Sequence, residues 1–143
     1  MNSFSLEYNI ALTKAEVWEK LFNELDQWWS KDFYTNLRTE SFIIEPTVGG
    51  KMYEDFGDGE GLIWGDIIGV DKPNSLLIRG MLSGEFGGPS ISFEKFILTE
   101  KNQQTSLIYR VEFINEVSEK TIKSLTTGWE TIFKDHFLPF CKR

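Results

Sequence analysis

The chain has 143 residues, and its 15 Lys and Arg against 22 Asp and Glu give a net charge of −7 at neutral pH. This length suits a single domain over residues 1–143. The 12 Phe, 5 Trp and 4 Tyr predict an aromatic-rich core that needs no disulfide. The acidic balance argues against nucleic acid and against an anionic membrane surface as partners, because both attract clustered Lys and Arg.

The N-terminus and the single cysteine indicate a cytoplasmic protein. The first residues have neither the basic region nor the apolar run of a signal peptide. Nowhere do about 18 apolar residues follow one another, as they would in a membrane-spanning helix. Cys141 has no second cysteine in the chain to pair with, which is typical of a reducing compartment.

The first 40 residues predict one strand followed by two short helices. Residues 3–11 alternate in part between apolar and polar, and the apolar face of this strand comprises Phe4, Leu6, Tyr8 and Ile10. Thr13 and Glu16 have the spacing of a capping box, so we expect a helix over about 14–23. A shorter helical turn is expected over 26–30.

From residue 40 onward the pattern predicts strands separated by turn residues. We expect them over 41–44, 50–55, 61–70, 75–81, 90–98 and 105–115. The short connections favour antiparallel pairing. Several charged residues fall within these segments, and alternation places most of them on the solvent face: Glu54, Arg79, Glu94, Arg110 and Glu112.

The last segment predicts one long helix that begins after Ser118 and is discouraged from continuing at Pro139. Gly128 lies in its middle, where glycine costs about 1 kcal/mol relative to alanine, so we expect either a closely packed neighbour or a cavity beside it. The order of elements indicates an α+β fold in which this helix crosses the sheet. A curved sheet and a straight helix do not match in shape, and small ligands bind in the space that remains between such layers.

The side chains that usually carry metal or catalytic chemistry are scarce. One His and one Cys cannot form a usual zinc site, so we expect no metal and no cofactor. A Ser-His-Asp relay would need His136, and the chain has no Gly-x-Ser-x-Gly elbow. The glycine-rich stretches 57–61 and 84–88 lack the spacing of phosphate-binding loops and are interpreted as turns.

Aromatic residues are the strongest candidates for a binding site, because they either fill the core or line a pocket for an apolar ligand. The predicted cavity lining is Trp29, Phe42, Tyr53, Trp64, Phe93, Tyr109, Leu125, Trp129, Phe133 and His136. His136 has two interpretations. It could present an imidazole to the cavity as an acid or base, or it could interact with the C-terminal end of the helix dipole.

Five features in order carry a resemblance to a known family: Val17-Trp18, Trp28-Trp29, Val48-Gly49-Gly50, the 61–73 strand with its proline turn, and Gly128-Trp129. Together they resemble the activator of heat shock protein 90 ATPase homologue family, within the START-like helix-grip (SRPBCC) superfamily. The resemblance implies a curved antiparallel sheet of about seven strands with two short N-terminal helices and a long C-terminal helix across it. It also implies a hydrophobic cavity and provides no catalytic residue.

Three functions remain in consideration. The first is a protein that binds a small hydrophobic or amphipathic molecule between sheet and helix without catalysing a reaction. The second is an interaction protein with a chaperone partner, using an exposed strand or the acidic stretch 54–71. The third is an enzyme of the cyclase or hydrolase kind, with His136, Tyr109 or Glu54 as acid or base. A monomer and a homodimer are both compatible with the sequence.

Overall fold

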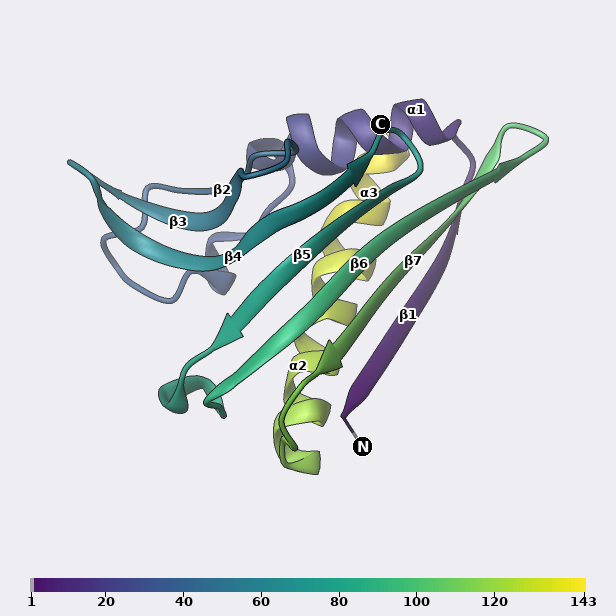
Figure 1. Cartoon of the computed structure of the whole chain (residues 1–143). Coiled ribbons are helices and arrows are strands. Elements are labelled where there is room, and N and C mark those ends of the chain that lie inside the picture. The colour runs from purple at the N-terminus through teal and green to yellow at the C-terminus, as the bar shows by residue number, and fades with distance from the viewer. Residues whose placement is uncertain (1) are drawn as a thin grey trace.

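The structure, a computed structural model, describes residues 2–143. Seven strands form one antiparallel sheet in the order β1-β7-β6-β5-β4-β3-β2. The strands are β1 Ser3–Ile10, β2 Ser41–Ile44, β3 Lys51–Gly57, β4 Glu60–Asp71, β5 Ser75–Leu82, β6 Ser90–Lys101 and β7 Gln104–Phe113. The sheet curves around the C-terminal helix (Figure 1), and β1 at the start of the chain pairs with β7 near its end.

The helices lie on one side of the sheet (Figure 1). The helical segments are α1 Lys14–Trp18, η1 Glu19–Asn23, η2 Leu25–Gln27, η3 Lys31–Phe33, η4 Gly84–Phe86, α2 Glu119–Thr131, η5 Ile132–Phe137 and α3 Leu138–Cys141. The segments α1 and η1 follow each other directly, as do α2, η5 and α3, so they form one shorter and one longer rod. The longer rod lies against the concave face of the sheet.

The two predicted helix starts are confirmed, whereas the predicted end of the last helix is wrong. Thr13 and Glu16 form the capping box, and the Ser118 side chain accepts a hydrogen bond from the Thr121 backbone N–H. The last helix passes through Pro139 and ends at Cys141. The preceding segment η5 has the wider π-helical hydrogen-bond pattern. Proline has no backbone N–H and cannot donate a hydrogen bond within a regular α-helix. We attribute the continuation of the helix through Pro139 to the wider hydrogen-bond pattern of η5.

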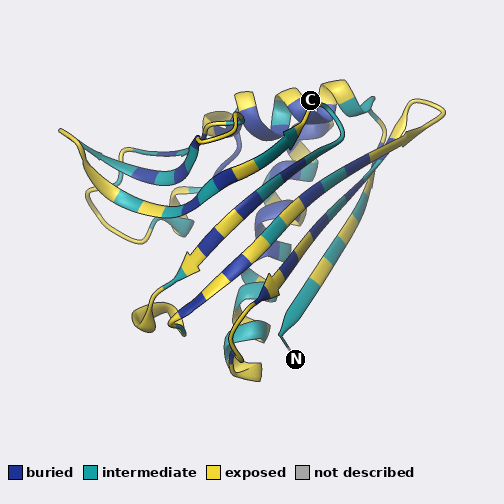
Figure 2. Cartoon of the chain, in the orientation of Figure 1, coloured by how far each residue is buried: buried dark blue, intermediate teal, exposed yellow. Residues whose placement is uncertain are grey.

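Alternation along the central strands divides the sheet into a buried and a more exposed face (Figure 2). The buried apolar positions on β5, β6 and β7 are Leu76, Ile78, Phe96, Leu98, Leu107, Tyr109, Val111 and Phe113. These residues meet the buried aromatic side chains of the long helical rod, among which Phe133 and Phe137 are fully buried. The sheet and the rod therefore share one core.

Two of the charged residues that alternation placed on the solvent face lie on the buried face instead. Arg79, Arg110 and Glu112 are exposed, as predicted. Glu54 is fully buried, and the half-buried Glu94 faces the same side as Phe96. Alternation fixes which residues share a face, but tertiary packing decides which face is covered.

Two further expectations concern the helices: the surroundings of Gly128 and the length and hydropathy needed to span a membrane. A Cβ atom at Gly128 would meet no atom within 4 Å, so no closely packed neighbour explains this glycine. Within residues 2–143, no helix combines the length and the apolar composition that crossing a bilayer requires.

Candidate functional site

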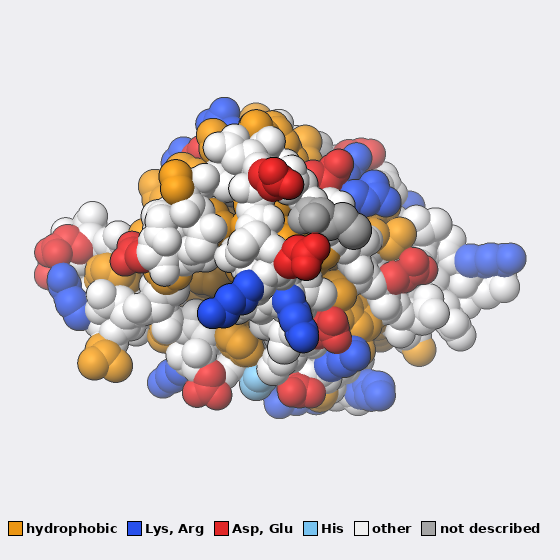
Figure 3. All heavy atoms as spheres, turned by 90° about the horizontal axis from the view of Figure 1, so that it is seen from below, with side chains coloured by type: hydrophobic (Ala, Val, Ile, Leu, Met, Phe, Trp, Pro, Cys, Tyr) orange, Lys and Arg blue, Asp and Glu red, His pale blue; other side chains and the backbone are white. Residues whose placement is uncertain are grey.

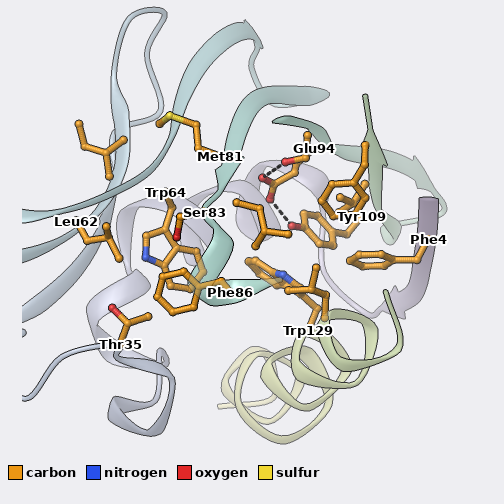
Figure 4. Close-up of a pocket in the computed structure, with 16 residues that line it drawn as sticks. Phe4, Thr35, Leu62, Trp64, Met81, Ser83, Phe86, Glu94, Tyr109 and Trp129 are labelled. Carbon is orange, nitrogen blue, oxygen red and sulfur yellow. Dashed lines mark hydrogen bonds between the residues drawn. The ribbon is translucent and has the colours of Figure 1, made fainter. Parts of the chain in front are cut away.

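A cavity of about 370 Å³ lies between the concave face of the sheet and α2 (Figure 4). Its walls come from β1, from β4 to β7, from α2, and from the segments around Thr35 and Phe86. Because these elements are distant in the sequence, the cavity exists only once the sheet has paired and the last helix has packed. Its volume lies in the range of about 300 to 1,000 Å³ that is usual for small-molecule sites.

Aromatic side chains form one wall of the cavity. The Tyr109 and Trp129 ring centroids are 4.5 Å apart, and Phe4 meets Tyr109 edge-on at 6.2 Å. Tyr109 is fully buried and Trp129 is nearly so. Since neighbouring rings hold each other in place, this wall offers a preformed apolar surface that needs little ordering when a ligand binds.

The cavity opens to solvent where its lining residues are exposed. Ile63, Met81 and Phe86 line it and remain 46%, 49% and 42% exposed, respectively. Figure 3 views the end of the molecule at which η4 lies and shows hydrophobic side chains at the surface among both acidic and basic groups. Exposed apolar side chains around an opening are typical of a ligand entrance.

Glu94 is the principal polar group of the cavity. The Tyr109 hydroxyl donates a hydrogen bond to Glu94 Oε1 at 2.5 Å, and the Ser92 hydroxyl donates to Oε2 at 3.0 Å (Figure 4). Burial raises the pKa of the Glu94 carboxyl, and the two hydrogen bonds counteract part of this rise. Burial and the negative charge of Glu94 raise the pKa of Tyr109, so its hydroxyl stays protonated and donates.

Gly80 creates the space in which this carboxylate lies. Gly80 lies on β5, directly opposite Ser92 of the neighbouring strand β6. A Cβ atom at position 80 would lie 2.0 Å from Glu94 Oε2 and 2.3 Å from Ser92 Oγ. Any larger residue at position 80 would therefore force the carboxylate or the strands to move.

A second inward-facing carboxylate, the fully buried Glu54, fixes another side of the cavity without lining it. Its Oε1 accepts hydrogen bonds from the Thr35 backbone N–H at 2.8 Å and from the Thr39 hydroxyl at 2.7 Å. Its Oε2 accepts from the Thr35 hydroxyl at 2.7 Å and from the Trp64 indole N–H at 2.9 Å. Thr35 and Trp64 both line the cavity, so Glu54 holds two of its residues in place.

The structure places the predicted site residues in three groups. Trp64, Tyr109, Leu125 and Trp129 line the cavity. Trp29, Phe42 and Phe133 lie in the core behind it. Trp29 stacks on Phe42 with ring centroids 4.1 Å apart, and its own ring lies 6.2 Å from Trp64 and 5.9 Å from Trp129. These three residues therefore support the cavity wall from behind.

The remaining three predicted residues lie away from the cavity. Tyr53 is half-buried and alternates with the inward-facing Glu54, and Phe93 is 37% exposed on the opposite face of the sheet from Glu94. His136 is half-buried and packs edge-on against Phe33, with ring centroids 5.9 Å apart.

Sequence reasoning missed Glu94 because β6 contains two overlapping alternations. Ile91 and Phe93 are apolar in one phase, and Phe96 and Leu98 are apolar in the other. The second phase is the buried one, and it includes Glu94. The pairing of β6 with β7 indicates which phase is buried, because Phe96 lies directly opposite the inward-facing Tyr109.

Metal chemistry has no candidate centre in the described part of the chain. Among residues 2–143, no three His, Cys, Asp or Glu side chains come together in a way that could hold a metal ion. The described lining residues supply apolar walls, one carboxylate and the hydroxyl groups of Thr35, Ser83, Ser92 and Tyr109.

Comparisons with known proteins find solved structures with a similar fold and no similar sequence family. No protein-family model and no curated protein sequence matches the chain. The chain is similar to DynU16, a protein of the dynemicin biosynthetic locus, with 20% identity and a TM-score of 0.65 over 90% of this chain and 43% of the other. It therefore spans less than half the length of DynU16.

Two further solved structures have the same architecture. CalU16 from Micromonospora echinospora is 21% identical, with a TM-score of 0.64 over 97% of this chain and 74% of the other. A subunit of the Aha1 dimer from Colwellia psychrerythraea is 14% identical, with a TM-score of 0.66 over 93% of this chain and 91% of the other. Similarity at these identities concerns the fold alone, and it confirms that the chain has the predicted helix-grip fold.

Proposed function

We propose that the chain is a cytoplasmic protein that binds a small hydrophobic or amphipathic molecule in the cavity between the sheet and α2. The observation that carries this proposal is a cavity of about 370 Å³ whose walls are mainly aromatic and aliphatic. The size and the few inward polar groups are typical of ligand sites. Burial of apolar ligand surface against rings such as Trp129 would supply most of the affinity.

Binding without catalysis agrees best with the positions of the acid and base candidates. Of His136, Tyr109 and Glu54, only Tyr109 lines the cavity. The four hydrogen bonds that Glu54 accepts come from the protein itself. Two of these three groups could act together as acid and base only if both reached the same bound substrate.

The proposed family relationship is with the activator of heat shock protein 90 ATPase homologues, on the sequence features given above. The similarity to the Colwellia Aha1 structure supports it at the level of the fold. A chaperone partner stays a prediction, as does the choice between monomer and homodimer.

The neutral fluorescent probe N-phenyl-1-naphthylamine tests the proposal directly. Its emission should rise on binding to the protein, and Leu125→Trp should strongly reduce this rise by filling the cavity from α2. The matched control is Lys123→Trp, which adds the same side chain at an exposed position of the same helix. Equal binding by the two variants, or no binding by the unmodified protein, would contradict the proposed function.

A further inference from the structure

Glu94 gives the cavity a feature that binding of a purely apolar molecule would not need. Among the described residues that line the cavity, it alone is an acidic or basic side chain other than tyrosine. It is half-buried and lines the cavity. An ionised carboxylate is costly to bury unless charge or hydrogen bonds compensate it.

The partners that compensate Glu94 are neutral. Tyr109 and Ser92 each donate one hydrogen bond, whereas a carboxylate has about four acceptor positions. Asp66 on β4 makes an instructive contrast, because Lys51 and Arg79 both pair with it. Glu94 therefore keeps acceptor capacity, with no cation from the described lining residues beside it.

The neighbouring residues hold this carboxylate toward the cavity. Tyr109 binds one oxygen from β7, and Ser92 binds the other from β6 itself. Gly80 leaves open the place on β5 that the carboxylate fills. Three adjacent strands thus fix one acidic group on an otherwise apolar wall, and Figure 4 shows it above the Trp129 ring.

We propose that Glu94 is the recognition group for a protonated amine, so that the cavity selects an amphipathic ligand with an aromatic or aliphatic body and a cationic amine head. This inference rests on the proposed function, because it names the class of ligand that the same cavity takes. The ligand body packs against Trp129 and Tyr109, and its ammonium group donates to the free acceptor positions of Glu94. The aromatic faces nearby further favour a cation.

A series of three matched probes separates this inference from general apolar binding. The probes are 1-naphthylmethylamine, 1-naphthylmethanol and 1-naphthoate, which share one ring system and differ in the charge of the head group. Their affinities for the full chain are measured by isothermal titration calorimetry near neutral pH. The amine should bind about tenfold to a hundredfold more tightly than the alcohol, as expected for one hydrogen-bonded charge pair. The carboxylate should bind most weakly.

The variant Glu94→Gln keeps the shape of the side chain and removes its charge. The ratio of amine to alcohol affinity should then fall to within about threefold of one. Glu112→Gln is the matched control, because it removes an exposed carboxylate from β7 and should leave the ratio as it is.

Each outcome of the series is decisive. An amine preference that Glu94→Gln abolishes and Glu112→Gln preserves supports the inference. Equal affinities for amine and alcohol in the unmodified protein overturn it, as does preference for the naphthoate, and in both cases the proposed function stands. Failure of all three probes to bind contradicts the proposed function itself. If Glu94→Gln does not fold, equal affinities for amine and alcohol in the unmodified protein still overturn the inference.

Discussion

Gly80 and Glu94 depend on each other across the pairing of β5 and β6. The carboxylate Oε2 lies 2.0 Å from the place that a Cβ atom on residue 80 would take. A strand glycine ordinarily weakens a sheet, and here its missing side chain leaves room for an inward-facing acid. The polar side of the cavity is therefore determined by two residues that are not adjacent in the sequence.

Gly80→Ala should displace the Glu94 carboxylate and destabilise the fold by about 1 kcal/mol, the lower end of the usual cost of overpacking, because the displaced atoms are side-chain ends that border the cavity. Urea unfolding measures this change. Gly69→Ala is the control on the neighbouring strand, because its Cβ atom would meet Leu77 at an ordinary 3.4 Å. A stability loss no larger at position 80 than at position 69 would contradict the tight fit.

Glu54→Ala should destabilise the protein. It would leave the hydrogen-bond donors of Thr35, Thr39 and Trp64 without their acceptor. A buried donor left without a partner costs about 1 to 3 kcal/mol, and these donors are only partly buried, so we expect a loss of about 1 to 3 kcal/mol in total in the free energy of unfolding. Equilibrium unfolding followed by tryptophan fluorescence measures it.

The control for Glu54→Ala is Glu112→Ala, which removes an exposed carboxylate from a strand of the same sheet. We expect a change of about 0.5 kcal/mol or less for this surface substitution. Similar losses for the two variants would show that the hydrogen bonds to Glu54 contribute little.

The raised pKa of Glu94 should appear in the pH dependence of stability. A carboxyl whose pKa is higher in the folded than in the unfolded chain binds more protons when folded, so its contribution to stability decreases as pH rises. This decrease begins near the ordinary value of 4.5 and ends above the raised pKa of the folded state.

Unfolding free energies of the unmodified protein and of Glu94→Gln, measured from about pH 4 to pH 8, isolate this effect. The stability of the unmodified protein relative to the variant should fall across this interval. A difference in stability that stays constant or grows with pH would contradict this prediction.

Gly128→Ala should stabilise the protein. The helical position favours alanine by about 1 kcal/mol, and a Cβ atom there would contact nothing within 4 Å. Thermal unfolding should show a higher Tm. A lower Tm would indicate that the open space beside this glycine is needed in a way that its surroundings do not reveal.

The sequence alone determined the order of the elements, the antiparallel pairing and the two capped helix starts, because each depends on local periodicity and short-range hydrogen bonding. Ser118 and the pair Thr13 and Glu16 act within a few residues of their own position. Of the ten residues predicted to line a cavity, four do so: Trp64, Tyr109, Leu125 and Trp129.

Only the tertiary structure decided which face of each strand is covered. In β6 both phases of the alternation contain apolar residues, so local pattern could not determine that Glu94 faces inward and Phe93 outward. The same holds for Glu54, whose four hydrogen-bond donors come from residues that approach it only after folding. A buried charge is tolerated through its partners, and partners brought together from distant segments leave no periodic trace in the chain.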